Sequence, residues 1–278
     1  MRTLVNRSAI AVALLGLTAC RAFTNYPSLA GPRYAADRPF VSSPTLRATP
    51  GAVRVVTYNV QFARHIDRAI YVLRSRAGLR NADIITLQEM DAEGTRRIAD
   101  ALGMAFVYYP AGVHPSTGRD MGNAILSHWP IVADEKLVLP HLGRMRHARR
   151  IATAATILIG DAAVRVYSVH LGTPTDIGPG KRRDQVRTVM ADAARYPRVV
   201  VAGDLNSRGV GKEFSAVGFL WPTEHNPFTT AFFNWDHIFF KGFASPDSAR
   251  TGVVRDTLRT SDHDPVWAVA LLPTVPAR

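Results

Sequence analysis

Polar side chains of the kinds that bind metals and phosphates follow one apolar run of this sequence after another. The runs are short and rich in β-branched residues, which is typical of β-strands. The polar residues that border them are Asn59, Glu89, His170, Asp204, Asn206, Asp236, Asp262 and His263. Taken singly, each is most often a turn or capping residue. Strand ends on one edge of layered sheets converge in space, however, so these side chains could form a single site.

The residue types in this set indicate metal-assisted hydrolysis of phosphate esters. Carboxylate oxygens such as those of Glu89 suit Mg²⁺ or Mn²⁺ rather than a zinc site built from Cys and His. A phosphodiester repels nucleophiles, so a cation must offset its charge and a base must activate water. An imidazole needs a carboxylate to fix its tautomer, and Asp262 is the neighbour that offers one to His263. The sequence contains no Gly-x-Ser-x-Gly elbow, P-loop or His-Glu-x-x-His motif.

The elements that must position these residues alternate between strands and helices. Helical periodicity predicts helices over residues 66–76, about 92–102 and 183–196. Many strands, few helices and directly linked strand pairs favour a layered α/β sandwich. The predicted strands cover residues 53–58, 84–87, 124–127, 151–159, 164–169, 199–202, 238–240 and 266–272.

Size and composition allow one large core with a basic surface. The chain has 278 residues, of which 47% are hydrophobic and 20% charged, an ordinary balance for a globular protein. Its formal net charge of +12 indicates either a solvated basic surface or attraction to phosphates. The phosphates could belong to nucleic acid, lipid headgroups or soluble phosphoesters, and net charge does not choose among them.

The N-terminus has the pattern of a bacterial lipoprotein. Arg2 and Arg7 precede the apolar run 9–19, which is too short to span a bilayer but suits a signal peptide. The run ends in Leu-Thr-Ala-Cys, which resembles a lipobox, and we expect lipidation at Cys20, the single Cys. A plain signal peptide with a chance Cys is the alternative. With Cys20 used as the anchor, thiol catalysis is excluded.

Three segments follow from this pattern. Residues 1–20 are expected to be the lipoprotein signal peptide, residues 21–50 a proline-rich tether, and residues 51–278 the catalytic domain. The residue after the Cys is Arg21, which is not the Asp of inner-membrane retention. We therefore expect a lipoprotein of the bacterial cell envelope, held by its lipid in the outer membrane and facing the periplasm.

Seven motifs in order resemble those of the endonuclease/exonuclease/phosphatase superfamily. That superfamily includes deoxyribonucleases, abasic-site endonucleases, inositol polyphosphate 5-phosphatases and bacterial sphingomyelinases. The resemblance runs from Val53 to about Leu272 and implies a four-layer α/β/β/α sandwich with the site between two sheets. The motifs are Thr57-Tyr58-Asn59-Val60, Leu87-Gln88-Glu89, Gly122-Asn123-Ala124-Ile125-Leu126-Ser127, Ser168-Val169-His170-Leu171, Gly203-Asp204-Leu205-Asn206, Trp235-Asp236-His237-Ile238-Phe239 and Ser261-Asp262-His263-Asp264-Pro265.

The resemblance also implies a role for each matching residue. Glu89 would be the principal Mg²⁺ (or Mn²⁺) ligand, with Asn59 beside the metal. Asp204 would orient or deprotonate the attacking water, Asn206 would hold the phosphate, and His170 would contact the phosphate or assist the leaving group.

The remaining motif residues would act on the charged transition state. His263, oriented by Asp262, would stabilise the transition state or transfer a proton, and Asp236 would complete the network. We expect Asn123, Arg149 and Arg183 to contact the substrate. The two arginines belong to basic clusters at residues 141–150 and 181–183, which are either solvated segments or an electropositive wall of the cleft.

The sequence favours a monomeric metal-dependent phosphodiesterase, with a nuclease slightly ahead of other substrates. Lipid or inositol phosphates are the alternative substrates, and a non-catalytic phosphate-binding envelope protein is the alternative class. No aromatic-interleaved basic strip supports nucleic acid. Because they lead directly into the Asp236 motif, Phe228, Phe232, Phe233 and Trp235 are expected in the core rather than on a lipid-inserting surface.

Overall fold

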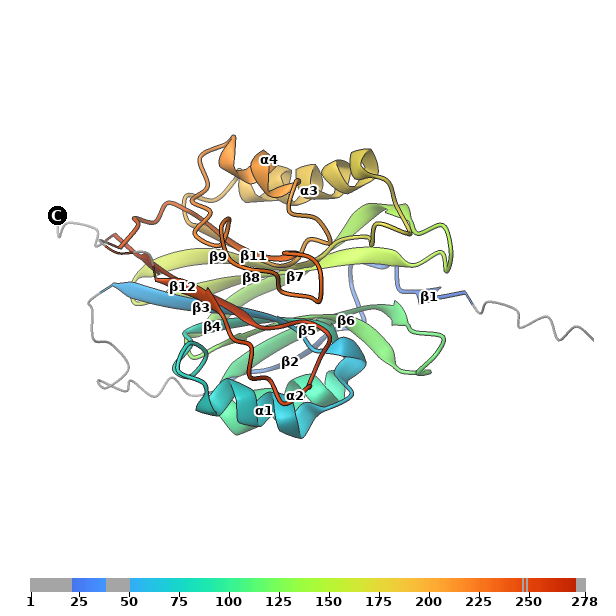
Figure 1. Cartoon of the computed structure of the whole chain (residues 1–278), viewed down its shortest axis with the longest axis horizontal. Helices are drawn as coiled ribbons and strands as arrows, with labels where there is room; N and C mark the ends of the chain where they lie inside the picture. Colours follow the sequence, from blue (N-terminus) through green and yellow to red (C-terminus); the bar gives the residue numbers. More distant parts are fainter. Residues whose placement is uncertain (1–21, 39–50, 247, 249, 274–278) are drawn as a thin grey trace, which may run out of the picture.

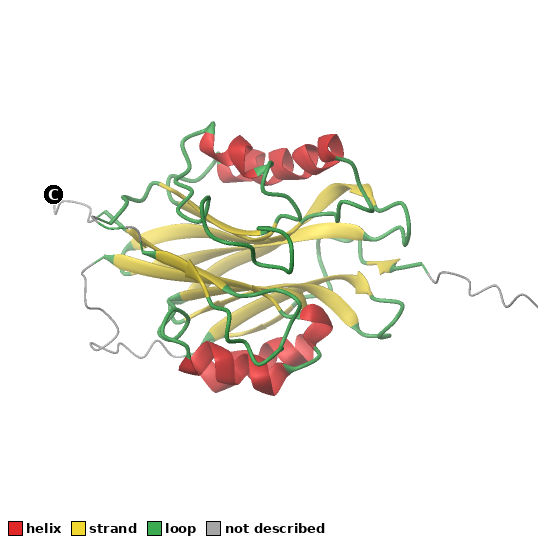
Figure 2. Cartoon of the chain, in the orientation of Figure 1, coloured by secondary structure: helices red, strands yellow, loops and turns green. Residues whose placement is uncertain are grey.

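The computed structural model of the chain describes residues 22–38, 51–246, 248 and 250–273. In this part of the chain two β-sheets pack face to face, and helices cover the outer face of each sheet (Figures 1 and 2). The layers follow the order α/β/β/α, so the expected four-layer sandwich is confirmed. None of the described helices is long and apolar enough to cross a membrane.

The larger sheet has the strand order β1-β5-β6-β4-β3-β13-β12, and β2 also pairs with β5. Its centre is the parallel pair β3 and β4, which carries two of the predicted site motifs. The strand bounds are β1 Thr24–Asn25, β2 Tyr34–Ala36, β3 Ala52–Asn59, β4 Ile84–Met90, β5 Ala105–Val113, β6 Asp120–Ser127, β12 Thr251–Val253 and β13 Val266–Leu271.

The smaller sheet has the order β11-β10-β9-β8-β7. Strands β9 and β10 are parallel, and β10 and β11 are antiparallel, so the ends of β9 and β10 and the start of β11 share one edge. The strand bounds are β7 Ile131–Leu142, β8 Arg149–Ile159, β9 Ala162–His170, β10 Val199–Asp204 and β11 Asp236–Lys241.

The helices form the two outer layers. Helices α1 and α2 cover the larger sheet, and α3 and α4 cover the smaller one (Figure 1). The 3₁₀ turn η2 leads from β3 into α1. The bounds are η2 Gln61–Ala63, α1 Ile66–Ser75, α2 Ala92–Leu102, α3 Pro179–Ala193 and α4 Gly211–Ser215.

Side chains that alternate along the strands fill the space between the sheets. The apolar members of this central core include Val55, Ile84, Val166, Val200 and Ile238, all fully buried. Successive residues of a strand point to opposite faces, so the residues two and four positions further along the same strands also face the gap. The gap is therefore apolar in the middle and polar at the edge where the motif residues stand.

The segment 22–38 differs from its prediction. It was expected to be part of an extended tether, but β1 and β2 pair with β5 and the side chain of Phe23 is buried. The ammonium group of Lys136 donates to the carbonyls of Tyr26 and Gly31, at 3.0 and 2.9 Å. This stretch therefore belongs to the folded domain. The predicted signal peptide, Cys20 and residues 39–50 lie outside the described residues.

Most predicted elements are present with small shifts of their ends. Helix α2 has the predicted bounds, and α1 ends one residue early, whereas α3 begins at Pro179 rather than at Arg183. The sequence reading left out β5, β7 and β12, and also the short helix α4. Strand β5 contains Pro110 and Gly112 beside a register shift, which obscures its strand pattern.

Candidate active site

Three site residues lie side by side across the smaller sheet. In the strand register Asp204 of β10 is paired with His170 of β9 and with Asp236 of β11. All three continue the faces that carry Val166, Val200 and Ile238, so their side chains enter the gap between the sheets. All three are buried. The edge of the apolar core thus becomes a row of two carboxylates and one imidazole.

The larger sheet supplies Asn59 opposite this row. Asn59 ends β3, is 1% exposed, and donates from Nδ2 to Oδ2 of Asp204 at 3.1 Å. One step deeper, Gln88 of β4 donates from Nε2 to the hydroxyl of Ser168 on β9 at 3.0 Å. These two contacts fix the spacing of the two sheets at the edge where the site stands.

Glu89 reaches the site through a distortion of β4. Strand alternation would turn Glu89 away from the gap, because Gln88 already faces it. The pairing of β4 with β6 shifts register between Leu87 and Met90, and Glu89 has a left-handed backbone with φ of 56°. Such a bulge re-aims a side chain at a cost in backbone strain. Oε2 of Glu89 accepts from the amide of Phe62 at 3.2 Å, and Oε1 lies 4.0 Å from Nε2 of His170.

His263 is oriented by Asp236, which corrects the expectation for Asp262. Nδ1 of His263 lies 2.8 Å from Oδ2 of Asp236 in the buried site. Asp262 is exposed and its Oδ1 contacts the hydroxyl of Ser261 at 3.3 Å. The chain bends at these two residues, and it buries His263 while leaving Asp262 in solvent. Ser261 itself holds the segment to β3 by donating to the carbonyl of Asn59 at 2.7 Å.

Asp236 is also held by Thr229, a residue that the sequence analysis does not single out. The hydroxyl of Thr229 donates to Oδ2 of Asp236 at 2.6 Å. Oδ1 of Asp236 is buried and has no hydrogen-bond partner among the described residues. An unpaired buried carboxylate oxygen is costly unless a cation, a water or a ligand meets it.

His170 stands between the acidic groups and an arginine. Its Nε2 lies 3.4 Å from Oδ2 of Asp204, and its Nδ1 lies 3.2 Å from Nη1 of Arg150. Burial lowers the pKa of His170 well below its usual value, and the charges of Arg150 and His263 lower it further. The imidazole is therefore neutral at neutral pH and able to accept one hydrogen bond and donate another.

The pKa values of Asp204 and His263 suit them to opposite functions, Asp204 to accept a proton and His263 to carry one. Burial raises the pKa of Asp204 to about 7, because the charge of His263 offsets burial only in part. Burial alone would lower the pKa of His263, but the charges of Asp236 and Asp204 outweigh it and raise the value to about 10. Nε2 of His263 lies 3.7 Å from Oδ2 of Asp204. Asp204, whose pKa suits a general base at neutral pH, therefore lies beside the protonated imidazole of His263.

The donors at this edge fit a hard divalent cation. Carboxylate oxygens of Asp204 and Asp236 lie within 4.8 Å of each other and of a ring nitrogen of His263, and the two carboxylates are the groups of this set that can bind a cation while His263 is protonated. Glu89 adds a carboxylate with 16% of its side chain exposed, and burial raises its pKa because the nearby positive charges compensate only in part. Carboxylate and amide oxygens, including that of Asn59, are the donors that Mg²⁺ and Mn²⁺ prefer.

Two further predicted residues are buried beside the site. The amide of Asn206 donates to Oδ1 of Asp204 at 2.8 Å, and its side chain donates to the carbonyl of Leu171 at 3.0 Å. Asn123 donates from Nδ2 to the carbonyls of Ile151 and Ser168, at 2.9 and 3.2 Å. In this structure Asn123 therefore ties β6 to the opposite sheet.

The two predicted arginines do not reach the site, whereas their sequence neighbours do. Arg149 is tied to Asn25 and to the carbonyl of Leu139, but Arg150, the next residue of β8, contacts His170. Arg183 is exposed on α3, and the buried Arg182 donates to the carbonyl of Gly172 at 2.9 Å behind the site. The basic clusters were a usable signal. The sequence does not predict which arginine of each cluster faces the site, because that depends on the exact residues at which β8 and α3 begin.

The aromatic residues before Asp236 are exposed, which corrects the expectation that they belong to the core. Phe228, Phe232 and Phe233 are 55%, 74% and 49% exposed. Trp235 is half-buried and stacks face to face on Phe233, with ring centroids 4.5 Å apart. The loop before β11, which ends at Asp236, therefore presents exposed apolar side chains.

Comparison with known proteins agrees with this fold. The sequence profile of the Endonuclease/Exonuclease/phosphatase family matches residues 56–263. A search of curated protein sequences gives no match. Three solved structures with this fold share 21% sequence identity or less with the chain, so their similarity supports the fold alone.

An endonuclease/exonuclease/phosphatase from Beutenbergia cavernae has a TM-score of 0.64 and 21% identity, covering 80% of this chain and 72% of its own. A family protein from Bacteroides thetaiotaomicron has a TM-score of 0.61 and 18% identity, covering 81% and 100%. The human Nocturnin catalytic domain with a bound sulfate anion has a TM-score of 0.61 and 17% identity, covering 86% and 97%. The four-layer fold, the residues at its polar edge and the match over 56–263 together show that the chain belongs to the endonuclease/exonuclease/phosphatase family.

Proposed function

We propose that the protein is a divalent-metal-dependent phosphodiesterase of the nuclease type. The observation that carries this proposal is the pair of opposed groups at one edge, the carboxyl of Asp204 and the His263–Asp236 pair. Glu89 lies at the same edge, with Oε1 4.0 Å from Nε2 of His170. Family membership supports hydrolysis of phosphoester bonds. Non-catalytic phosphate binding would not require a carboxylate and an imidazole with such different pKa values in contact.

Each side chain has a task in this reaction. Glu89 and Asn59 would hold Mg²⁺ or Mn²⁺, which when bound offsets the charge of the phosphodiester. Asp204, with a pKa of about 7, accepts a proton from the attacking water. His263, held protonated by Asp236, stabilises charge on the phosphoryl oxygens or gives its proton to the leaving group.

Polynucleotides are the preferred substrate class of this proposal. Danio rerio TDP2, which has the same fold, is known in complex with a single-strand DNA product, at 17% identity and a TM-score of 0.61. The cation Arg150 lies at the site itself, and the chain's net charge of +12 attracts polyanions.

The test is turnover of a substrate panel by purified protein. Plasmid DNA, RNA, sphingomyelin and bis-p-nitrophenyl phosphate are offered with Mg²⁺ or Mn²⁺ and with EDTA. We expect turnover of the diesters that EDTA abolishes and either metal restores. Turnover that survives exhaustive chelation contradicts the metal, and no turnover of any substrate favours the phosphate-binding alternative.

A lipid phosphoester is the second candidate, and the exposed aromatic loop favours it. Phe228, Phe232 and Phe233 are exposed on the loop that leads into Asp236, and Thr229 of the same loop contacts that carboxylate, so an apolar part of a lipid substrate could meet this loop. Replacing Phe232 and Phe233 by Ser should then abolish turnover of sphingomyelin vesicles and leave bis-p-nitrophenyl phosphate turnover within about twofold. Unchanged vesicle turnover argues against this candidate.

A lipid on Cys20 would place this activity at a membrane of the bacterial envelope, and the outer membrane facing the periplasm is our proposal. Cys20→Ser should release the protein from the membrane fraction and remove labelling by a radioactive fatty acid, with turnover of bis-p-nitrophenyl phosphate unchanged. If the variant stays in the membrane fraction and the wild type takes up no label, the anchor is elsewhere.

A further inference from the structure

Phe23 and Asn25 form a bridge between the two sheets at the edge where the site stands. The backbone of β1 pairs with the larger sheet, where Asn25 is opposite Gly112 of β5. The amide of Phe23 reaches the loop between β7 and β8 in the smaller sheet, and donates to the carbonyl of Arg146 at 2.8 Å. The bridge lies outside the match to the family profile, which begins at residue 56.

The side chain of Asn25 pairs with the same loop as the peptide group of a strand would. Its Nδ2 donates to the carbonyl of His147 at 2.8 Å, and its Oδ1 accepts from the amide of Arg149 at 2.6 Å. Because Arg149 directly precedes Arg150, the bond to its amide fixes the peptide from which Arg150 starts.

The first residues of β8 are irregularly paired within their own sheet. The ladder between β8 and β9 begins at Ala152, and the pairing of β7 with β8 shifts register between Val138 and Leu142. Arg149 and Arg150 therefore precede the regular part of the strand. The backbone at Arg149 decides where the side chain of Arg150 points, because successive side chains of a strand leave on opposite faces.

Arg150 is the cation that this arrangement places at the site. Its Nη1 lies 3.2 Å from Nδ1 of His170, and Nε2 of the same ring lies 3.4 Å from Oδ2 of Asp204. The side chain is half-buried and long, and a long side chain loses much rotamer freedom when it is held in one place. A shift of the peptide before Arg150 would therefore move its charge away from His170.

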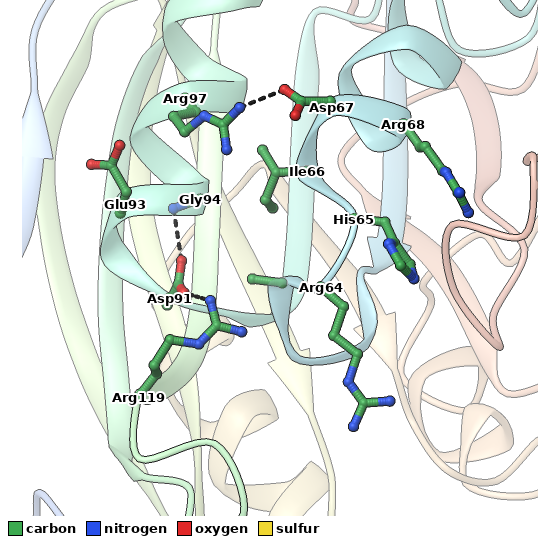
Figure 3. A pocket seen from close by; sticks show the side chains of 11 residues that line it. Arg64, His65, Ile66, Asp67, Arg68, Asp91, Glu93, Gly94, Arg97 and Arg119 are labelled. Atoms are coloured by element: carbon green, nitrogen blue, oxygen red, sulfur yellow. Dashed lines mark hydrogen bonds and ion pairs between the residues drawn. The ribbon is translucent and has the colours of Figure 1, made fainter.

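The bridge also adjoins the half of the site that the larger sheet supplies. The ring centroid of Phe23 lies 6.3 Å from that of His114, which in turn lies 4.6 Å from that of Phe62. The amide of Phe62 donates to Oε2 of Glu89 at 3.2 Å. Arg119, drawn in Figure 3, holds the same turn by donating to the carbonyl of Phe62 at 2.7 Å.

We propose that Asn25 is a positioning residue, which holds the start of β8 so that Arg150 stands beside His170. The inference rests on the proposed phosphodiesterase function, in which Arg150 is a cation at the site. The effect of Asn25 passes through the amide of Arg149. The domain expected at residues 51–278 therefore depends for its active site on the segment before it.

A double-mutant cycle between Asn25 and Arg150 tests the positioning. Asn25→Ala should lower kcat/KM for bis-p-nitrophenyl phosphate roughly five- to tenfold, because Arg150 loses its fixed place. In the Arg150→Gln background the same change should cost less than about twofold, since the group that Asn25 positions is already gone. Equal fold losses in the two backgrounds overturn the proposal.

Arg33→Gln is the matched control, because it loosens the same N-terminal segment away from the site. Arg33 donates from Nε and Nη2 to the carboxylate of Asp134, at 2.6 Å each. Asp134 precedes Leu142, the last residue of β7, by eight positions. This variant should keep kcat/KM within about twofold of the wild type. A loss as large as that of Asn25→Ala would assign the effect to weaker packing of the whole segment and overturn the positioning role.

Chemical modification of Arg150 gives a readout that needs no turnover. Phenylglyoxal reacts with accessible guanidinium groups. The protein is modified in EDTA to low conversion, and peptide mass spectrometry gives the rate at each arginine. Arg150 should react roughly fivefold faster in Asn25→Ala than in the wild type or in Arg33→Gln, because its contact with His170 is released. The exposed Arg183 should react at the same rate in all three proteins.

The two readouts separate this inference from the proposed function. If no diester is turned over but Arg150 reacts faster in Asn25→Ala alone, the positioning stands and the phosphodiesterase does not. If diesters are turned over but Arg150 reacts equally in all three proteins, the phosphodiesterase stands and Asn25 is not its positioning residue.

Discussion

Oδ2 of Asp236 lies 2.8 Å from Nδ1 of His263, although 27 residues separate the two along the chain. The contact joins the start of β11 to the loop before β13, and the hydroxyl of Thr229 donates to the same carboxylate oxygen. It makes Asp236 the positioning residue of the imidazole. Asp262, the direct neighbour of His263, points to solvent.

This contact predicts which aspartate matters for the reaction. His263→Ala should lower kcat roughly a hundredfold or more with little change in KM, because its charge acts on the transition state. Asp236→Asn should lower kcat at least tenfold, and Asp262→Asn should stay within about twofold. Steady-state kinetics with bis-p-nitrophenyl phosphate measure all three. A larger loss in the Asp262 variant than in the Asp236 variant would falsify the assignment.

The raised pKa of His263 predicts a pH-dependent contribution to stability. Its pKa rises from 6.5 in the unfolded chain to about 10 in the folded protein, so the folded state binds the extra proton between these values. The contribution is complete below pH 6.5 and is lost as the pH rises to 10, by about 1.4 kcal/mol for each pH unit.

Urea unfolding in EDTA at pH 6, 8 and 10 tests this contribution. The free energy of unfolding of the wild type should exceed that of His263→Gln most at pH 6 and least at pH 10. His225→Gln is the control, because its ring is 84% exposed and its effect should be small at every pH. A difference that stays constant from pH 6 to 10 contradicts the raised pKa.

Removal of the charge at Glu89 should separate metal binding from folding. Burial raises the pKa of Glu89, so its ionised form opposes folding when no cation is bound. In EDTA at pH 8 we expect Glu89→Gln to have a higher Tm than the wild type. Mg²⁺ should raise the Tm of the wild type and of the control Glu213→Gln but not that of Glu89→Gln. An equal Mg²⁺ response in all three proteins excludes Glu89 as a ligand.

The contact between Arg150 and His170 predicts a difference between neighbouring arginines. Arg150→Gln should lower kcat/KM for diesters at least tenfold, because it removes the half-buried cation beside His170. Arg149→Gln, which removes a side chain that donates to the carbonyl of Leu139, should stay within about threefold. Circular dichroism and Tm confirm that both variants fold. The reverse order of effects would show that the orientation of β8 differs in solution.

The sequence predicted that several polar residues would gather at one sheet edge because they continue the strands that build the core. The apolar run 199–202 predicts a strand, and Asp204 follows it as a polar residue at the strand's end. The row of His170, Asp204 and Asp236 then follows from the strand register. The four layers follow from alternating strands and amphipathic helices.

The sequence could not predict contacts that depend on the exact pairing of distant segments. Asp236 rather than Asp262 contacts His263, and Arg150 rather than Arg149 contacts His170. Both outcomes depend on the direction in which each side chain leaves its segment. The bulge at Glu89 and the left-handed turn at Phe62 arise from strain that no propensity reveals. The position of Phe232 just before the Asp236 motif likewise suggested burial, but the loop before β11 leaves it exposed.

The burial of Phe23 limits the distance that a lipid anchor at Cys20 could leave between the domain and the membrane surface. Phe23 is three residues beyond Cys20, and its ring lies against that of His114, which in turn contacts Phe62 beside the site. Three residues span at most about 10 Å, a third of the thickness of a bilayer's hydrocarbon core. An acyl group on Cys20 would therefore hold the catalytic edge close to the lipid surface. Such an enzyme is confined to two dimensions, and its substrates must come to the membrane.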